Sequence, residues 1–89
     1  MHVMITGAAG FIGASLSLRL LERGDTVTGI DNLNDYYDVS LKAARLARLM
    51  PHEQFDFSKA DISDQHEMQR LFSDRQFDAV VNLAAQAGV

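Results

Sequence analysis

The stretch MITGAAGFIGASL, residues 4–16, places three glycines between a short apolar run and a leucine-bearing segment. Glycine weakens a helix or strand interior by about 0.5–1 kcal/mol relative to alanine. Three glycines at one junction therefore indicate that another group must approach the backbone closely there. The apolar side predicts a strand over His2–Thr6, and the leucine side predicts a helix over Phe11–Arg23 that stops at Gly24. The three glycines are Gly7, Gly10 and Gly13.

Outward from this junction, strand-like and helix-like segments alternate along the chain. The further expected elements are a strand over Thr26–Asp31, a helix from a cap at Asp38 to Met50, a strand over Gln54–Ser58, a helix from a cap at Asp64 to about Arg75, and a strand over Asp78–Ala84. Strands that alternate with helices predict a parallel sheet with right-handed crossovers. No repeat or internal linker interrupts the 89 residues, so residues 1–89 are expected to form a single unit.

Composition limits the class of protein. Apolar residues make up 47% of the chain and charged residues 22%, which is typical of a globular protein rather than a disordered one. The net charge of −4 argues against a general nucleic-acid binder. The chain has no cysteine, so disulfides and thiolate sites are excluded. Without a signal-peptide pattern or an apolar run of membrane-spanning length, we expect no membrane partner and a cytoplasmic location.

A glycine-rich turn between the first strand and the first helix is typical of a phosphate site. Gly7 would allow the tight turn, Gly10 would let a pyrophosphate approach the backbone, and Gly13 would let helix and strand pack closely. The following helix N-terminus offers free N–H groups and a partial positive charge to an anion. The spacing is G-x-x-G-x-x-G rather than G-x-G-x-x-G, and a purely structural role for the three glycines stays open.

Asp31 ends the second strand, about twenty residues past the glycine turn. A carboxylate there can accept hydrogen bonds from both hydroxyls of an adenosine ribose, and it would repel a 2′-phosphate. The two features together favour a dinucleotide site that prefers NAD to NADP. The alternative is an ordinary loop or helix-cap acid.

Longer stretches resemble a known family. TGAAGFIG, GIDNLNDYYDVSLKAARL, ADISD and NLAAQAGV are similar to the extended short-chain dehydrogenase/reductase superfamily, and within it to NAD-dependent nucleotide-sugar epimerases, especially UDP-glucuronate 4-epimerases. The resemblance covers all 89 residues but only the first part of a family protein. It implies a Rossmann-type, doubly wound parallel sheet, here partial, with four strands in the order 3-2-1-4 and three helices.

The resemblance also implies which residues contact the cofactor NAD. The implied contacts are Gly7, Gly10, Phe11, Ile12 and Gly13 to the pyrophosphate, Asp31 and Asn32 to the adenosine ribose, Asp61 and Ile62 beside the adenine, and Leu83, Ala84, Ala85 and Ala87 along the cofactor channel. Relatives often carry histidine where this chain has Asn82, a position beside the cofactor segment that is not catalytic.

The catalytic groups of such a family are not among these residues. The family's chemistry needs a Tyr-x-x-x-Lys pair, and the residues four positions past Tyr36 and Tyr37 are Ser40 and Leu41. We therefore assign no catalytic residue, and expect the chain alone to be inactive. The resemblance implies a parent enzyme that epimerises UDP-glucuronate at C4 through a transient 4-keto sugar. A dehydratase or reductase of the same superfamily, or a non-catalytic self-associating dinucleotide-binding module, are the alternatives.

Three other patterns receive plainer interpretations. His2, His52 and His66 show no metal-ligand spacing, so no metal site is expected. Lys42, Arg45 and Arg48 form a basic stripe at helical spacing, interpreted as a solvated helix face. The strand containing Val80, Val81 and Leu83 would lie at an open sheet edge, which predicts a homo-oligomer.

Overall fold

The computed structural model describes residues 1–33, 39–74 and 76–83. Four strands alternate with three helices in that part of the chain. In chain order they are β1 (His2–Thr6), α1 (Phe11–Arg23), β2 (Thr26–Asp31), α2 (Val39–Leu49), β3 (Phe55–Lys59), α3 (Gln65–Asp74) and β4 (Ala79–Asn82).

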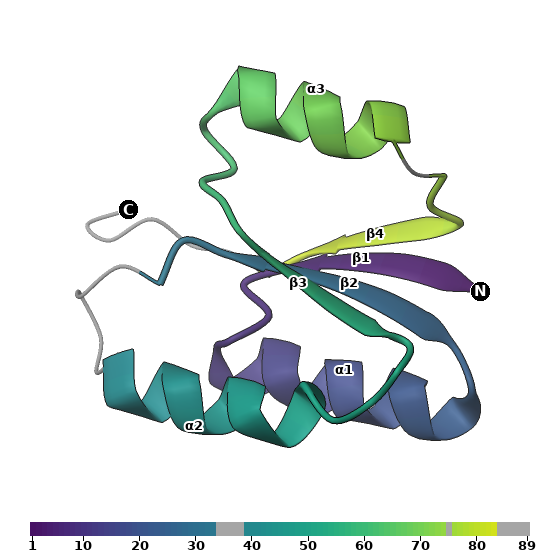
Figure 1. The fold of residues 1–89 in the computed structure, drawn as a ribbon, viewed down its shortest axis with the longest axis vertical. Coiled ribbons are helices and arrows are strands. Elements are labelled where there is room, and N and C mark those ends of the chain that lie inside the picture. Colours follow the sequence, from purple (N-terminus) through teal and green to yellow (C-terminus); the bar gives the residue numbers. More distant parts are fainter. Residues whose placement is uncertain (34–38, 75, 84–89) are drawn as a thin grey trace.

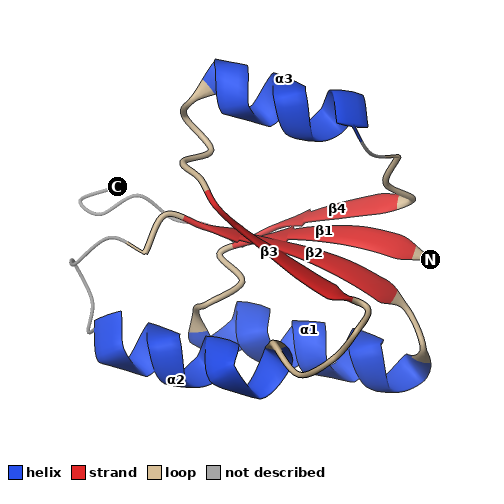
Figure 2. Ribbon diagram, in the orientation of Figure 1, coloured by secondary structure: helices blue, strands red, loops and turns tan. Residues whose placement is uncertain are grey.

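The strands form one parallel sheet in the order β3-β2-β1-β4, which confirms the expected Rossmann-type topology. The sheet is the middle layer: α1 and α2 cover one face, and α3 covers the other (Figures 1 and 2). All four strands run in the same direction, so their carboxyl ends lie along one edge. The strand order changes direction between β1 and β4. Sheets of this type bind their ligands at the carboxyl end of such a point.

The core has two unequal parts because the sheet is covered unequally. On the side of α1 and α2, buried apolar side chains from strands and helices form the larger cluster, including Val3, Ile5, Val27 and Leu49. On the α3 side, the buried residues are Met4, Ile30 and Ala60, with half-buried Met68, Leu71 and Phe77 against them. The strands at the centre are therefore buried on both faces, as parallel sheets require.

Helix ends follow the expected local chemistry. Gly24 closes α1 in the left-handed conformation, and its N–H donates to the carbonyls of Leu20 and Leu21. Oδ1 of Asp64 accepts from the amides of His66 and Glu67, so the predicted cap of α3 is confirmed. The predicted cap at Asp38 lies outside the described residues.

β3 begins and ends one residue later than predicted, and β4 has its last paired residue at Asn82.

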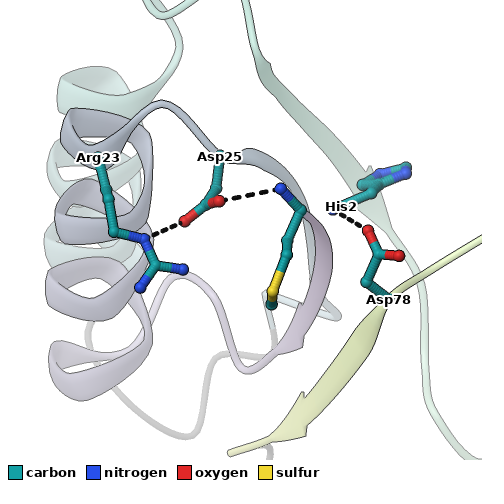
Figure 3. Close-up of polar contacts among 5 residues, drawn as sticks. His2, Arg23, Asp25 and Asp78 are labelled. Atoms are coloured by element: carbon teal, nitrogen blue, oxygen red, sulfur yellow. Dashed lines mark hydrogen bonds and ion pairs between the residues drawn. The ribbon is translucent and has the colours of Figure 1, made fainter.

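Contacts with two carboxylates hold the start of β1 to the segments that precede β2 and β4 (Figure 3). Oδ1 of Asp25 lies 3.0 Å from the Met1 ammonium, and Oδ2 accepts from Nε of Arg23 at 2.8 Å. The backbone N–H of His2 donates to Oδ2 of Asp78 at 2.6 Å. The Asp78 carboxylate therefore fixes β1 beside the start of β4.

The Asp25 contacts predict a pH-dependent effect of Asp25→Asn. Hydrogen bonds from Arg23 and from the N-terminal ammonium hold the pKa of the Asp25 carboxyl below its usual value. A carboxyl with a lowered pKa stabilises the fold above its unfolded pKa of about 3.9, and this contribution disappears as the pH falls through the folded pKa. Asp25→Asn should therefore lower the melting temperature at pH 7, and the difference should close progressively below about pH 4.

Thermal melts from pH 7 to pH 2.5 test this prediction, with Glu53→Gln in an exposed turn as the control. A melting-temperature difference for Asp25→Asn that is unchanged at the lowest pH would contradict it.

Candidate functional site

The glycine turn connects β1 to α1 at the carboxyl edge of the sheet (Figure 1). Its first amides are already engaged, since the N–H groups of Gly7 and Ala8 both donate to the carbonyl of Ile30, at 2.8 and 3.2 Å. Gly7 has a backbone φ of 73°, a conformation that residues other than glycine rarely adopt. The turn is thereby fixed against the end of β2 before the chain enters the helix.

Gly13 is required by a close approach. An added Cβ at Gly13 would lie 2.1 Å from the carbonyl oxygen of Gly7, far inside van der Waals contact. Ser17, one turn further along α1, is fully buried and donates to the carbonyl of Gly13 at 2.7 Å. The first turn of α1 can therefore lie directly against the glycine turn only because position 13 has no side chain.

The N-terminus of α1 is left uncapped. Gly10 occupies the N-cap position with no side-chain hydrogen bond, and the first turn contains no acidic residue. The first intrahelical bond runs from Ala14 N to Gly10 O, so the amides of residues 11–13 have no acceptor within the helix. Phe11 and Ile12 are 72% and 65% exposed. These features leave a positive helix end that suits an anion.

Asp31 lies beside this helix end and is nearly buried, with an exposed fraction of 6%. Its Oδ2 accepts from the amide of Ala9 at 3.1 Å. Its Oδ1 accepts from the amide of Leu33 at 2.8 Å and from the ammonium of Lys42 at 3.0 Å. The carboxylate is thus tied to both the glycine turn and α2.

The predicted solvated stripe on α2 is wrong for two of its three members. Lys42 is buried against Asp31, and Arg45 is half-buried. The Arg45 guanidinium donates to the carbonyl of Ala9 at 3.3 Å and lies 5.9 Å from the centre of the Phe11 ring. Only Arg48 is exposed as predicted. The buried Lys42 and the half-buried Arg45 face acceptors on β2 and the glycine turn, which the helical spacing alone did not show.

The other predicted contacts are distributed along the same edge. Asn32 follows Asp31 directly, and Leu83 follows β4. Oδ1 of Asp61 accepts from the amide and the hydroxyl of Ser63, and these bonds lower the pKa of the Asp61 carboxyl. Ile62 lies in the same turn, at one end of a hollow along α3 that Met68 and Phe72 also line. The predicted positions Ala84, Ala85 and Ala87 lie outside the described residues.

One further contact at this edge was not predicted. The Thr6 hydroxyl donates to the Asn82 side-chain carbonyl, and the Leu83 amide lies 3.1 Å from both oxygens of Thr6. The last residues of β1 and β4 are therefore joined through side chains as well as through the sheet. The only sequence signal was a polar residue at the end of each strand.

The described residues contain neither a metal-binding cluster nor a membrane-spanning helix. Within residues 1–33, 39–74 and 76–83, no three His, Asp or Glu side chains gather into a group that could hold a metal ion. In that same part of the chain, no helix combines the length and the apolar composition needed to cross a bilayer.

Comparison with known proteins identifies the family. The model of the GDP-mannose 4,6 dehydratase family matches residues 4–89. The chain belongs to the GDP-mannose 4,6 dehydratase family. This result confirms the resemblance to NAD-dependent epimerases and dehydratases of nucleotide sugars.

Individual proteins similar to this chain agree with the family assignment. Protein CapI of Staphylococcus aureus is 47% identical over 89 residues, which are 100% of this chain and 26% of CapI. UDP-glucuronate 4-epimerase 6 of Arabidopsis thaliana is 47% identical over the whole chain and 19% of its own length. The chain thus spans about a quarter or less of these relatives.

A solved structure of the same kind superposes on the whole chain. UDP-glucuronic acid 4-epimerase from Bacillus cereus, in complex with UDP-glucuronic acid and NAD, is 36% identical, with a TM-score of 0.85. The match covers 100% of this chain and 28% of the Bacillus cereus chain. The four-stranded architecture is therefore that of the corresponding part of a nucleotide-sugar epimerase.

Proposed function

We propose that residues 1–89 are the NAD-binding portion of a nucleotide-sugar epimerase, whose parent reaction is C4 epimerisation of UDP-glucuronate. The observation that carries the proposal is the uncapped N-terminus of α1 beside the buried Asp31 carboxylate. An anion-binding helix end and a ribose acceptor at one sheet edge match the two polar parts of an adenine dinucleotide. The relatives named above support the choice of sugar.

The residues present fit NAD at each of these positions. The amides of residues 11–13 would hold the pyrophosphate, and the missing side chains at Gly10 and Gly13 would let it approach the backbone. Asp31 and Asn32 would hold the ribose, Asp61 and Ile62 would flank the adenine, and Leu83 would border the channel. Ala84, Ala85 and Ala87 are proposed to extend that border.

The chemistry that NAD supplies when bound is reversible acceptance of a hydride from a sugar carbon. The role of this chain's own residues is to bind and orient: the helix end fixes the diphosphate, and Asp31 fixes the ribose. The nucleotide-sugar substrate and the groups that move its protons are assigned to the parent enzyme, so the chain alone is proposed to be inactive. A dehydratase or reductase of the same superfamily would use this part of the chain in the same way.

Calorimetric titration of the chain with NAD and with NADP tests the proposal. NAD should bind, and NADP should bind more weakly because its 2′-phosphate would face Asp31. Equal or tighter binding of NADP would contradict the assignment of Asp31. No binding of either dinucleotide would favour a module that associates without a cofactor.

A further inference from the structure

The feature that goes beyond this assignment is the ion pair between Asp31 and Lys42. Lys42 lies on α2, and its ammonium is 3.0 Å from Oδ1 of Asp31. The two side chains are only 4% and 11% exposed, so solvent screens their charges little. The ion pair directly links the end of β2 to α2.

The bonds to Asp31 limit what it can offer a ligand. An ionised carboxylate has about four acceptor positions on its two oxygens. Among the described residues, Leu33 and Lys42 occupy two positions on Oδ1, and Ala9 occupies one on Oδ2. With respect to the described residues, one position on Oδ2 is left, which suffices for one ribose hydroxyl and not for two.

The ammonium also lies within electrostatic range of any group that binds there. A group bonded to Oδ2 is separated from the Lys42 ammonium by two hydrogen bonds and the width of a carboxylate, roughly 8 Å at most. An anion at a ribose 2′ position would therefore interact with a carboxylate and an ammonium whose charges offset each other.

We propose that Lys42 is a specificity-determining residue of this site, because its ammonium balances Asp31 and weakens discrimination against a 2′-phosphorylated dinucleotide. The inference rests on the proposed dinucleotide-binding function. Under this inference, preference for NAD is a property of the Asp31–Lys42 pair. Without the carboxylate, the same ammonium becomes a ligand for a 2′-phosphate.

The test is the ratio of the dissociation constants for NADP and NAD, measured by calorimetry on the chain and its variants. Lys42→Met removes the ammonium and keeps a side chain of similar length, so the ratio should rise by about tenfold or more. Arg48→Met removes one charge from the exposed side of the same helix, and should leave the ratio within about twofold of the parent chain. Equal ratios for the two variants would overturn the inference.

A second comparison keeps the test decisive if Lys42→Met fails to fold with an unbalanced buried carboxylate. Asp31→Asn leaves the ammonium in place and should bind NADP better than the parent does. Adding Lys42→Met to Asp31→Asn gives a neutral pair, and NADP affinity should fall again by about tenfold. Equal NADP affinity in these two proteins would overturn the inference.

The two proposals fail differently. Binding of NAD by the parent chain with a ratio that Lys42→Met does not change would remove the role of Lys42 alone. A folded parent chain that binds neither dinucleotide would remove the proposed function and the inference with it.

Discussion

Gly13→Ala is expected to lower the free energy of unfolding by about 1–3 kcal/mol, a large share of the stability of so small a domain. The new Cβ would lie 2.1 Å from the carbonyl oxygen of Gly7. The opposing atom is backbone, fixed by the bonds from Gly7 and Ala8 to Ile30, so it cannot turn away as a side chain would. The first turn of α1 must therefore move outward.

The same displacement should weaken NAD binding by at least about tenfold, because amides that stabilise an anion act only at hydrogen-bond distance. Urea unfolding and calorimetric titration measure the two effects. Ser15→Ala is the matched control, since it adds alanine to an exposed position of α1, where its helix propensity is slightly favourable. A Gly13→Ala protein with the stability and NAD affinity of the parent would show that the turn can move without cost.

Val80→Lys is expected to raise the dissociation constant of a self-associated form by at least about tenfold, through charge placed on the edge of β4 that pairs with no other described strand. β4 is the last strand of the sheet, and among the described residues it pairs only with β1. Val80 is 49% exposed, on the face that carries the smaller core, whereas Val81 packs against the larger one. A lysine at position 80 should therefore block edge pairing with less damage to the fold than one at position 81.

Sedimentation at micromolar concentrations measures this effect. Ser15→Lys adds the same charge to an exposed position of α1, and should leave association unchanged. A dimer is the simplest closed arrangement of two such edges. A parent chain that is well folded and strictly monomeric at these concentrations would contradict the proposal.

The alternation of apolar strands with leucine-bearing helices was enough to predict a parallel sheet and to place its elements within one or two residues of their observed bounds, whereas the strand order came from the family resemblance. Gly7 and Gly13 could be recognised because a backbone requirement restricts the residue type at its own position. These features are local, or they repeat with the period of one element. Such features can be predicted from sequence, because the residue type at each position directly reflects the local backbone conformation or the burial of that position.

The burial of Lys42 could not be predicted in the same way. A lysine at helical spacing from Arg45 and Arg48 is normally solvated, since burying an unpaired charge is costly. It is tolerated here because Asp31, eleven positions earlier in the chain, accepts its hydrogen bond. The bond between Thr6 and Asn82 joins residues 76 positions apart. Such pairings depend on the assembled fold, and the sequence around one partner does not predict the identity of the other.

The pairing of β1 with β4 also has a consequence for how the chain folds. β1, α1 and β2 are consecutive, so their contacts close short loops, whereas the bonds from His2 to Asp78 and from Thr6 to Asn82 each span 76 positions. Contacts of high sequence separation form slowly, because the entropy of closing the loop must be lost first. β4 should accordingly join the sheet last and leave it first. The glycine turn and Asp31 would then assemble before Leu83 reaches its place beside Thr6.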